Sequence, residues 1–227
     1  MPAAASYQPA RLPDPTRPLA GERVRLEPID AGRHASDLFE AADPSRPDAD
    51  PRLWDFMSFG PFSSAAELAE WAAARQGDVD PLTYAIVDLK AGRAAGSAAL
   101  QRATPEHGFI EIGHVWFGPP LQRTPQGTEA ILLLLRHAFD ELGYRRVEWK
   151  CDVRNARSRA AAERLGFRLE GVFRRHMIVK GASRDTAWYA IVDEEWPEVA
   201  AALERWLAPD NFDASGRQRR RLQDLRA

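Results

Sequence analysis

The sequence is poor in the residues that small secreted and metal-dependent proteins use for stability. It has 227 residues and a single cysteine, Cys151, so no intramolecular disulfide can form. A chain of this length can bury roughly 70% of its unfolded surface, which makes a structural metal or disulfide unnecessary. Its five histidines are dispersed and lack the spacing of zinc ligands, so we expect no metal site. These features favour a reducing compartment, and we expect a cytoplasmic location.

Long apolar runs and a strong charge imbalance are also missing. The longest strongly apolar run covers residues 130–135, which is far too short to span a bilayer. Residues 1–20 include five prolines and no continuous apolar stretch, so we expect no signal peptide. The formal net charge is −2, whereas nucleic-acid binding normally needs a basic face. We therefore expect neither a membrane nor a nucleic acid as a partner, although local clusters of arginine leave an anion site open.

What is present is a sequence of strand and helix patterns without internal repeats. The alternation of apolar and polar residues predicts strands over 23–29, 82–88, 94–102, 109–117, 146–153, from 167–170 onward, 173–179 and 187–193. Helical periodicity and capping residues predict helices over 31–42, 64–75, 126–142, 156–165 and 194–207. This order predicts an α/β (mixed α+β) domain with a single mixed sheet over 21–207. An extended arm (1–20) precedes it, and a basic tail (208–227) follows.

The junction before the long helix has the features of a phosphate-binding loop. The first turn of a helix offers unpaired backbone N–H groups and the positive end of the helix dipole, which together attract phosphate. Here Gly127 would allow close approach, Thr124 and Thr128 add hydroxyl groups, and Arg123 adds positive charge. Many such junctions bind nothing, so this pattern alone leaves a purely structural loop as the alternative.

Four short motifs follow one another along the chain: Glu111-Ile112-Gly113, Gln122-x-x-Pro125-x-Gly127, Asn155-x-x-Ser158 and Leu165-Gly166-Phe167-x-Leu169-Glu170-Gly171. Their order and spacing resemble the GNAT (Gcn5-related) N-acetyltransferase superfamily over roughly residues 23–196. The residues within these motifs are most similar to those of the branch that contains the ribosomal-protein N-terminal acetyltransferases.

The resemblance implies a GNAT-like domain with a central, mostly antiparallel mixed sheet that is flanked by helices and splayed at the CoA site. It implies acetyl-CoA as the co-substrate and transfer of its acetyl group to a primary amine. That amine belongs either to a protein N-terminus or to a small molecule. Family members carry out this transfer by direct attack of the amine on the thioester.

The same resemblance assigns residues that bind the co-substrate. Pantetheine is expected along the strand before the loop, and the pyrophosphate on the loop and the first helical turn. The implied binding residues are Val115, Trp116, Phe117, Gln122, Arg123, Thr124, Gln126, Gly127, Thr128 and Asn155. Pro125 replaces the first glycine of the family's loop pattern and has no N–H to donate, so one pyrophosphate contact is expected to be lost.

Catalytic residues follow from the same alignment of motifs. Asn155 and Ser158 match positions beside the cofactor thiol, where the Ser158 hydroxyl could donate a proton to the departing sulfur. The alternative is that both residues only cap the short helix, because Asn and Ser are favoured there. Both roles can hold for different residues.

The motifs do not single out one residue as the general base. Glu111 matches the family strand motif and is placed ahead of His114, although histidine titrates closer to neutral pH. Three residues apart on a straight strand, the two side chains would point to opposite faces, unless Gly113 marks a bulge. Alternatively, Glu111 only pairs with an arginine and holds the strand. His176 and Asp185 are outside candidates.

A second class of function stays open beside the enzyme. Related ribosomal-protein enzymes carry a carboxylate where Met177 stands here, and Pro125 removes a phosphate contact. Both departures would suit a CoA-binding regulatory module with little or no turnover. The sequence does not identify the acceptor amine, and a homodimer is one option for its assembly.

Overall fold

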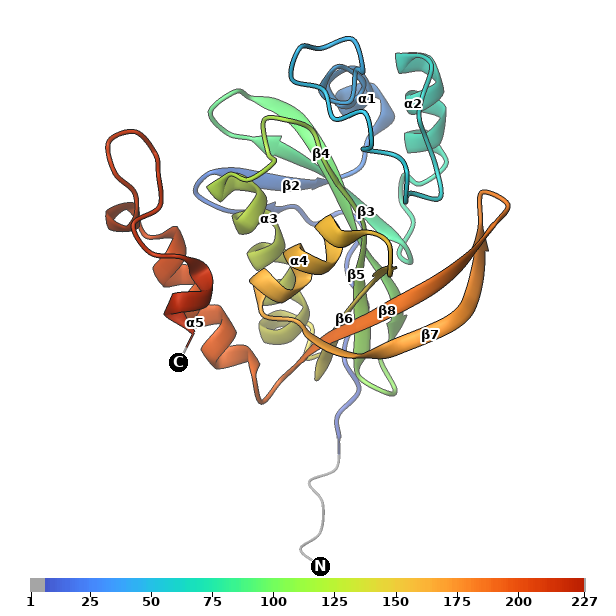
Figure 1. Ribbon diagram of the computed structural model, residues 1–227. Helices are drawn as coiled ribbons and strands as arrows, with labels where there is room; N and C mark the ends of the chain where they lie inside the picture. Colours follow the sequence, from blue (N-terminus) through green and yellow to red (C-terminus); the bar gives the residue numbers. More distant parts are fainter. Residues whose placement is uncertain (1–6, 227) are drawn as a thin grey trace, which may run out of the picture.

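Eight strands form one mixed sheet in the computed structural model, which describes residues 7–226 (Figure 1). The strand order is β1-β2-β3-β4-β5-β6-β8-β7, and only β5 and β6 run parallel. The strands are β1 Leu19–Ala20, β2 Val24–Pro28, β3 Leu82–Asp88, β4 Arg93–Thr104, β5 Phe109–Phe117, β6 Arg146–Asp152, β7 Arg168–Val179 and β8 Ala182–Val192. The predicted α/β class with a mostly antiparallel sheet is therefore confirmed.

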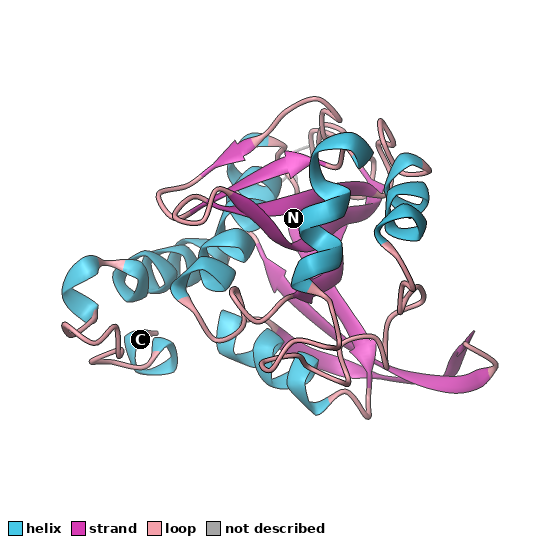
Figure 2. Cartoon of the chain, turned by 90° about the horizontal axis from the view of Figure 1, so that it is seen from above, coloured by secondary structure: helices cyan, strands magenta, loops and turns pink. Residues whose placement is uncertain are grey.

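Helices cover both faces of this sheet (Figure 2). They are α1 Ala31–Ala41, α2 Ala65–Ala73, α3 Pro125–Arg136, α4 Ala156–Leu165 and α5 Trp196–Leu207. Side chains alternate along β3, so that Tyr84 packs in the apolar cluster under α3 while Ala85 packs in the cluster under α1 and α2. The sheet thus separates an α3–α4–α5 side from an α1–α2 side, and the site described below uses both.

The helix starts lie where the capping residues predict them. The Ser64 side chain accepts a hydrogen bond from the Glu67 amide at 3.1 Å, and Asn155 accepts one from the Ser158 amide at 3.0 Å. Each such cap stabilises its helix by about 1 kcal/mol. The long helix differs at its end, because α3 stops at Arg136 and the chain continues as a π-helix over His137–Glu141.

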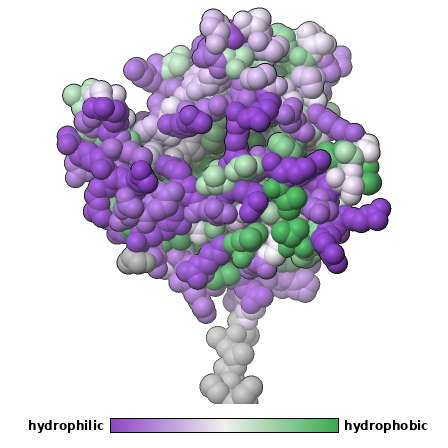
Figure 3. All heavy atoms as spheres, viewed as in Figure 1, coloured by the Kyte–Doolittle hydropathy of each residue, from purple (hydrophilic) through white to green (hydrophobic). Residues whose placement is uncertain are grey.

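Strand β7 corrects another expectation. The sequence suggested two strand segments, whereas one strand runs from Arg168 to Val179 with irregular pairing at two points. A residue at positive φ, Arg175 at 51°, lies in the second irregularity and breaks the alternation that the prediction relied on. The β7–β8 hairpin projects from the body, and Figure 3 shows hydrophobic residues among the hydrophilic ones on that side of the molecule.

The described parts of both terminal segments pack onto the domain. In the described part of the N-terminal arm, the Arg11 amide donates to the Leu142 carbonyl at 2.8 Å, and Ala10 is buried. Residues 1–6 of the predicted arm, and Ala227 at the other end, lie outside the described residues. In the basic tail, Leu222 and Leu225 are buried in the cluster that contains α5. Nowhere between residues 7 and 226 is a helix long and apolar enough to cross a membrane.

Candidate active site

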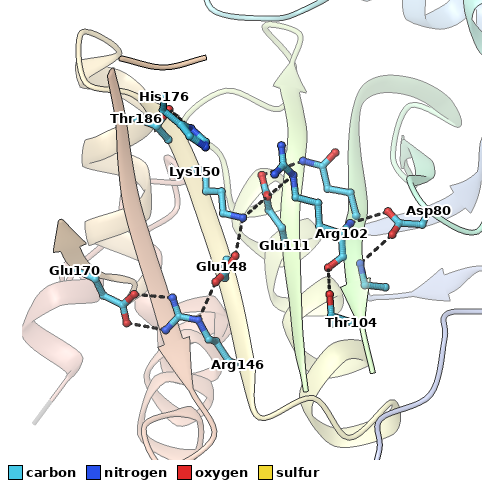
Figure 4. A network of polar contacts seen from close by, with 12 residues as sticks. Asp80, Arg102, Thr104, Glu111, Arg146, Glu148, Lys150, Glu170, His176 and Thr186 are labelled. Atoms are coloured by element: carbon cyan, nitrogen blue, oxygen red, sulfur yellow. Dashed lines mark hydrogen bonds and ion pairs between the residues drawn. The ribbon is translucent and has the colours of Figure 1, made fainter. Parts of the chain in front are cut away.

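The two parallel strands at the centre of the sheet separate after a short stretch of pairing. Strand β5 pairs with β6 only where Phe109–Glu111 lie beside 146–148. Beyond this point β5 continues to Phe117 and β6 to Asp152 without pairing to each other, and Figure 4 shows the strands diverging above Glu111 and Glu148. In the described residues, the β6-facing edge of Val115–Phe117 has no strand partner. The splay that the resemblance implies is therefore present.

A β-bulge on β5 lies inside this gap. Pairing with β4 passes from Ala99↔Gly113 to Ser97↔Trp116, so β5 uses one more residue than its partner. His114 has a φ of 51°, and the alternation is reversed after it: Ile112 packs on the α3 side, while Trp116 packs under α1 and α2. The opposite orientation expected for a straight strand therefore does not apply: the exception named above, a bulge beside Gly113, is present, and Glu111 and His114 lie on the same side of the sheet.

Glu111 is held by a network of charges on the α1–α2 side of the sheet (Figure 4). Its carboxylate accepts a hydrogen bond from Gln101 at 2.9 Å and lies 2.9 Å from the Lys150 ammonium and 3.3 Å from the Arg102 guanidinium. Lys150 also contacts Glu148 at 2.6 Å. Glu111 is 4% exposed. The ion pairs with Arg102 and Lys150 hold the carboxylate in place, so the network supports the structural alternative as well.

His114 lies on the same side in a more apolar setting. Its ring meets the Phe59 ring edge-on, with 5.4 Å between centroids, and its Nδ1 is buried with no hydrogen-bond partner in the described chain. Burial lowers the pKa of His114, and the positive charges of Arg75 and Arg102 lower it further. A neutral imidazole with a free ring nitrogen can accept a proton directly.

The lowered pKa of His114 predicts a pH dependence of stability. The pKa of His114 is lower in the folded protein than its ordinary value of about 6.5. As the pH falls towards and below that value, this histidine therefore binds more protons in the unfolded chain than in the folded protein. Stability is therefore lost as the pH falls through this range. A His114→Gln variant is expected to lose less stability between about pH 7.5 and 5.5 than the parent, measured by urea unfolding. Equal losses in both proteins would contradict the prediction.

The loop before α3 is shaped by its own hydrogen bonds. Thr124 caps the helix by accepting from the Gly127 amide at 3.4 Å, and its hydroxyl donates to the Leu121 carbonyl at 2.9 Å. Pro125 occupies the first helical position, and the Gln122 side chain donates to the Phe117 carbonyl at 2.8 Å. The loop thus bridges the end of β5 and the positive end of the α3 dipole, which suits a phosphate group.

Two of the residues predicted to contact phosphate, Gly127 and Thr128, also have a role in the packing of the protein. A Cβ on Gly127 would lie 2.6 Å from the Leu121 carbonyl oxygen and 3.0 Å from the Phe117 ring, so packing alone requires glycine there. The Thr128 hydroxyl is buried and accepts from Arg164 on α4 at 3.1 Å. Thr128 therefore joins two helices, a contact that the sequence did not indicate.

A Gly127→Ala variant tests the loop. We expect a loss of about 1–3 kcal/mol in stability, because the new methyl group overlaps Leu121 and Phe117. Any bound phosphate would also be displaced, so the increase in Tm on adding acetyl-CoA should shrink. That increase is measured against the variant's own Tm, which separates binding from folding. An Arg123→Gln variant serves as a comparison without the steric overlap. An acetyl-CoA shift equal to the parent's in both variants would overturn the loop assignment.

Asn155 and Ser158 have different partners at the start of α4. Asn155 is the N-cap residue, as one alternative predicted. The Ser158 hydroxyl oxygen instead accepts from the Trp149 indole at 2.9 Å. Cys151 lies nearby on the buried face of β6. Burial raises the pKa of its thiol, and a hydrogen bond with the Ser158 hydroxyl opposes that rise. The predicted role of Ser158 therefore requires its hydrogen to turn from this thiol to the departing sulfur.

The outside candidates lie on the projecting hairpin. His176 Nδ1 lies 3.0 Å from the Thr186 hydroxyl, and the Asp185 carboxylate accepts from the Arg175 amide at 2.6 Å. Lys150, with its ammonium 4.0 Å from the centre of the Trp188 ring, is a contributor that the sequence analysis missed. The one signal in the sequence that could have indicated Lys150 is the alternation of charged and apolar residues over 146–153. In the described residues no cluster of His, Cys, Asp and Glu could hold a metal ion.

The comparisons with known proteins identify the family. The profile of the Acetyltransferase (GNAT) domain matches residues 23–168, so the chain belongs to the GNAT acetyltransferases and is an acyltransferase. A GCN5-related N-acetyltransferase from Brucella melitensis superposes with a TM-score of 0.92 and 44% identity, covering 97% of this chain and 98% of that one. The resemblance on which the sequence analysis relied is thereby confirmed.

Two further relatives are informative. "Putative ribosomal N-acetyltransferase YdaF" of Bacillus subtilis is 28% identical over 177 residues, which is 75% of this chain and 90% of that protein. The microcin C7 self immunity acetyltransferase MccE, solved with acetyl-CoA and AMP, has a TM-score of 0.66 and 23% identity, covering 76% of this chain and 93% of that one. The second likeness concerns the fold alone.

Proposed function

We propose that this protein transfers the acetyl group of acetyl-CoA to a primary amine by direct attack of the amine on the thioester. The observation that carries the proposal is the gap between β5 and β6, with a helix N-terminus on the α3 side and titratable groups on the other. Acetyl-CoA supplies an activated acetyl group, so that the C–N bond forms as the C–S bond breaks. The crystal structure of MccE with acetyl-CoA supports the choice of donor.

The residues of this chain divide the work between the two sides of the sheet. On the α3 side, the loop at 122–128 would hold the pyrophosphate, and the free edge of Val115–Phe117 would accompany the pantetheine. Ser158 would give its proton to the departing sulfur. On the other side, either Glu111 or His114 takes the proton that the amine releases. The unpartnered Nδ1 of His114 favours it for direct transfer, whereas Glu111 accepts a hydrogen bond from Gln101 and forms ion pairs with Lys150 and Arg102.

The acceptor is a small-molecule amine or a protein N-terminus. The relative named as a ribosomal N-acetyltransferase supports the second option. The protein would be incubated with acetyl-CoA and a library of amines and N-terminal peptides, while free thiol is followed. Acetylated acceptors are then identified by mass. Thiol release that depends on the acceptor supports the enzyme, whereas binding of acetyl-CoA without turnover on any acceptor supports the regulatory module.

A further inference from the structure

A small hollow of about 270 Å³ lies where three segments meet on the α1–α2 side of the sheet. Asp55 comes from the connection between α1 and α2, Asp152 and Arg154 from the end of β6, and Lys180 and Arg184 from the tip of the β7–β8 hairpin. The catalytic assignments above use none of these five side chains.

The hollow is held in shape by contacts between its walls. The Lys180 ammonium donates to the carbonyls of Trp54 and Gly60 at 3.0 and 2.9 Å, which ties the hairpin to the α1–α2 connection. Arg157 on α4 forms an ion pair with Asp50 of the same connection. Segments far apart in the sequence therefore fix the hollow.

The hollow lies at the open end of the gap between β5 and β6. Asp152 lies four residues beyond Glu148, the last β6 residue that pairs with β5, which is about 13 Å along the strand. Asp152 and Lys150 share the α1–α2 side of β6, while Cys151 between them packs on the α4 side. A molecule in the hollow would thus approach the gap from the side opposite to α3 and α4.

The charges of the hollow are not balanced. Arg154 is neutralised by Asp152, through contacts of 2.9 and 2.6 Å. In contrast, Arg184 makes no ion pair in residues 7–226, and its Nε is buried without a hydrogen-bond partner. Lys180 contacts carbonyls but no carboxylate. Against these two cations stands one carboxylate without an ion pair, that of Asp55.

A buried guanidinium nitrogen without a partner is costly, and an anionic group relieves that cost by accepting its hydrogen bond. Arg184 also acts beyond the hollow. After burial, the charges of Arg102, Arg184 and Lys150 lower the pKa of His176, while Glu111 opposes them. Because Arg102 and Lys150 are paired with carboxylates, Arg184 is the one of these three cations that makes no ion pair in the described residues.

We propose that the hollow binds a carboxylate or phosphate group of the acceptor through Arg184 and Lys180, so that the acceptor is an amine that also carries an acidic group. This inference rests on the proposed function, because it assigns the hollow to the acceptor of that reaction. The acidic group fixes the acceptor on the α1–α2 side, while its amine extends into the gap between β5 and β6.

The test compares three acceptors with the same chain length: an ω-amino carboxylate, the matching ω-amino amide and the matching aminoalkyl phosphate. The parent is expected to use the two acids with a kcat/KM at least about tenfold above that of the amide. Arg184→Gln should remove this preference for acids by raising KM for the two acidic acceptors alone. Asp55→Asn should strengthen the preference, because it removes a negative charge from the hollow. Arg168→Gln, at the other end of β7, is the control and should leave the preference unchanged. Equal use of acid and amide by the parent, or an equal effect of Arg184→Gln on all three, would overturn the proposal.

A binding measurement keeps this inference apart from the proposed function. Inorganic phosphate is titrated into the protein by calorimetry, with saturating CoA present so that phosphate does not report on the α3 loop. The parent is expected to bind phosphate, and Arg184→Gln to bind it at least about tenfold more weakly. If no amine is acetylated but this difference holds, the proposed function fails and the anion site stands. No phosphate binding by the parent, or equal binding by both proteins, rejects the anion site.

Discussion

A Glu111→Gln protein is expected to lose both stability and activity, by amounts that identify which role the carboxylate has. The substitution keeps the shape of the side chain but leaves the nearly buried Lys150 with Glu148 as its remaining carboxylate. Removing one partner of a buried ion pair costs roughly 3 kcal/mol, to be measured by urea unfolding. If Glu111 also takes the proton of the amine, kcat/KM falls by about a hundredfold and the pH–rate profile changes shape.

A second substitution separates these effects. Lys150→Met in the Glu111→Gln background removes the ammonium from Glu148 as well, so it should not restore the stability, whereas Lys150→Met alone should reduce stability and leave the base in place. A pH–rate profile like the parent's, with undiminished kcat/KM, shows that Glu111 is not the base. His114→Gln then decides whether the imidazole takes the proton. If neither change matters, solvent removes the proton and the enzyme works mainly by positioning.

Replacing Ser158 with alanine is expected to lower kcat by about tenfold to a hundredfold while KM for acetyl-CoA changes little. The hydroxyl would donate only as the sulfur departs, so its loss raises the barrier more than it weakens binding. The same change leaves the Trp149 indole without its acceptor, which costs about 1–3 kcal/mol in stability. Steady-state kinetics and thermal unfolding are measured on the same preparations.

Trp149→Phe is the matched control for that variant. It removes the indole donor and keeps the Ser158 hydroxyl, so it should reduce stability and leave kcat close to the parent's. The double variant removes both partners, so it should regain part of the stability but none of the lost kcat. A normal kcat in Ser158→Ala would assign Ser158 to the structure of the α4 start alone.

The sequence by itself determined the elements that depend on neighbouring residues. Helix α4 occupies the predicted range, because Asn155 caps its start and Gly166, in the left-handed region at a φ of 109°, ends it. The β7–β8 turn lies at Lys180 and Gly181, which both have positive φ. The motif order also indicated the GNAT family, which the family model over residues 23–168 confirmed.

Only the tertiary structure decided how the site is arranged. The bulge at His114 depends on how β5 pairs with β4, where residues 113–116 lie against residues 97–99. No local sequence pattern specifies that register. Glu111 meets Lys150 because two parallel strands, joined through a helix, pair over three residues before separating. The hollow beside Arg184 brings together segments around residues 55, 152 and 184. Local sequence encodes caps and turns, whereas these contacts follow from the packing of distant segments, which only the folded chain fixes.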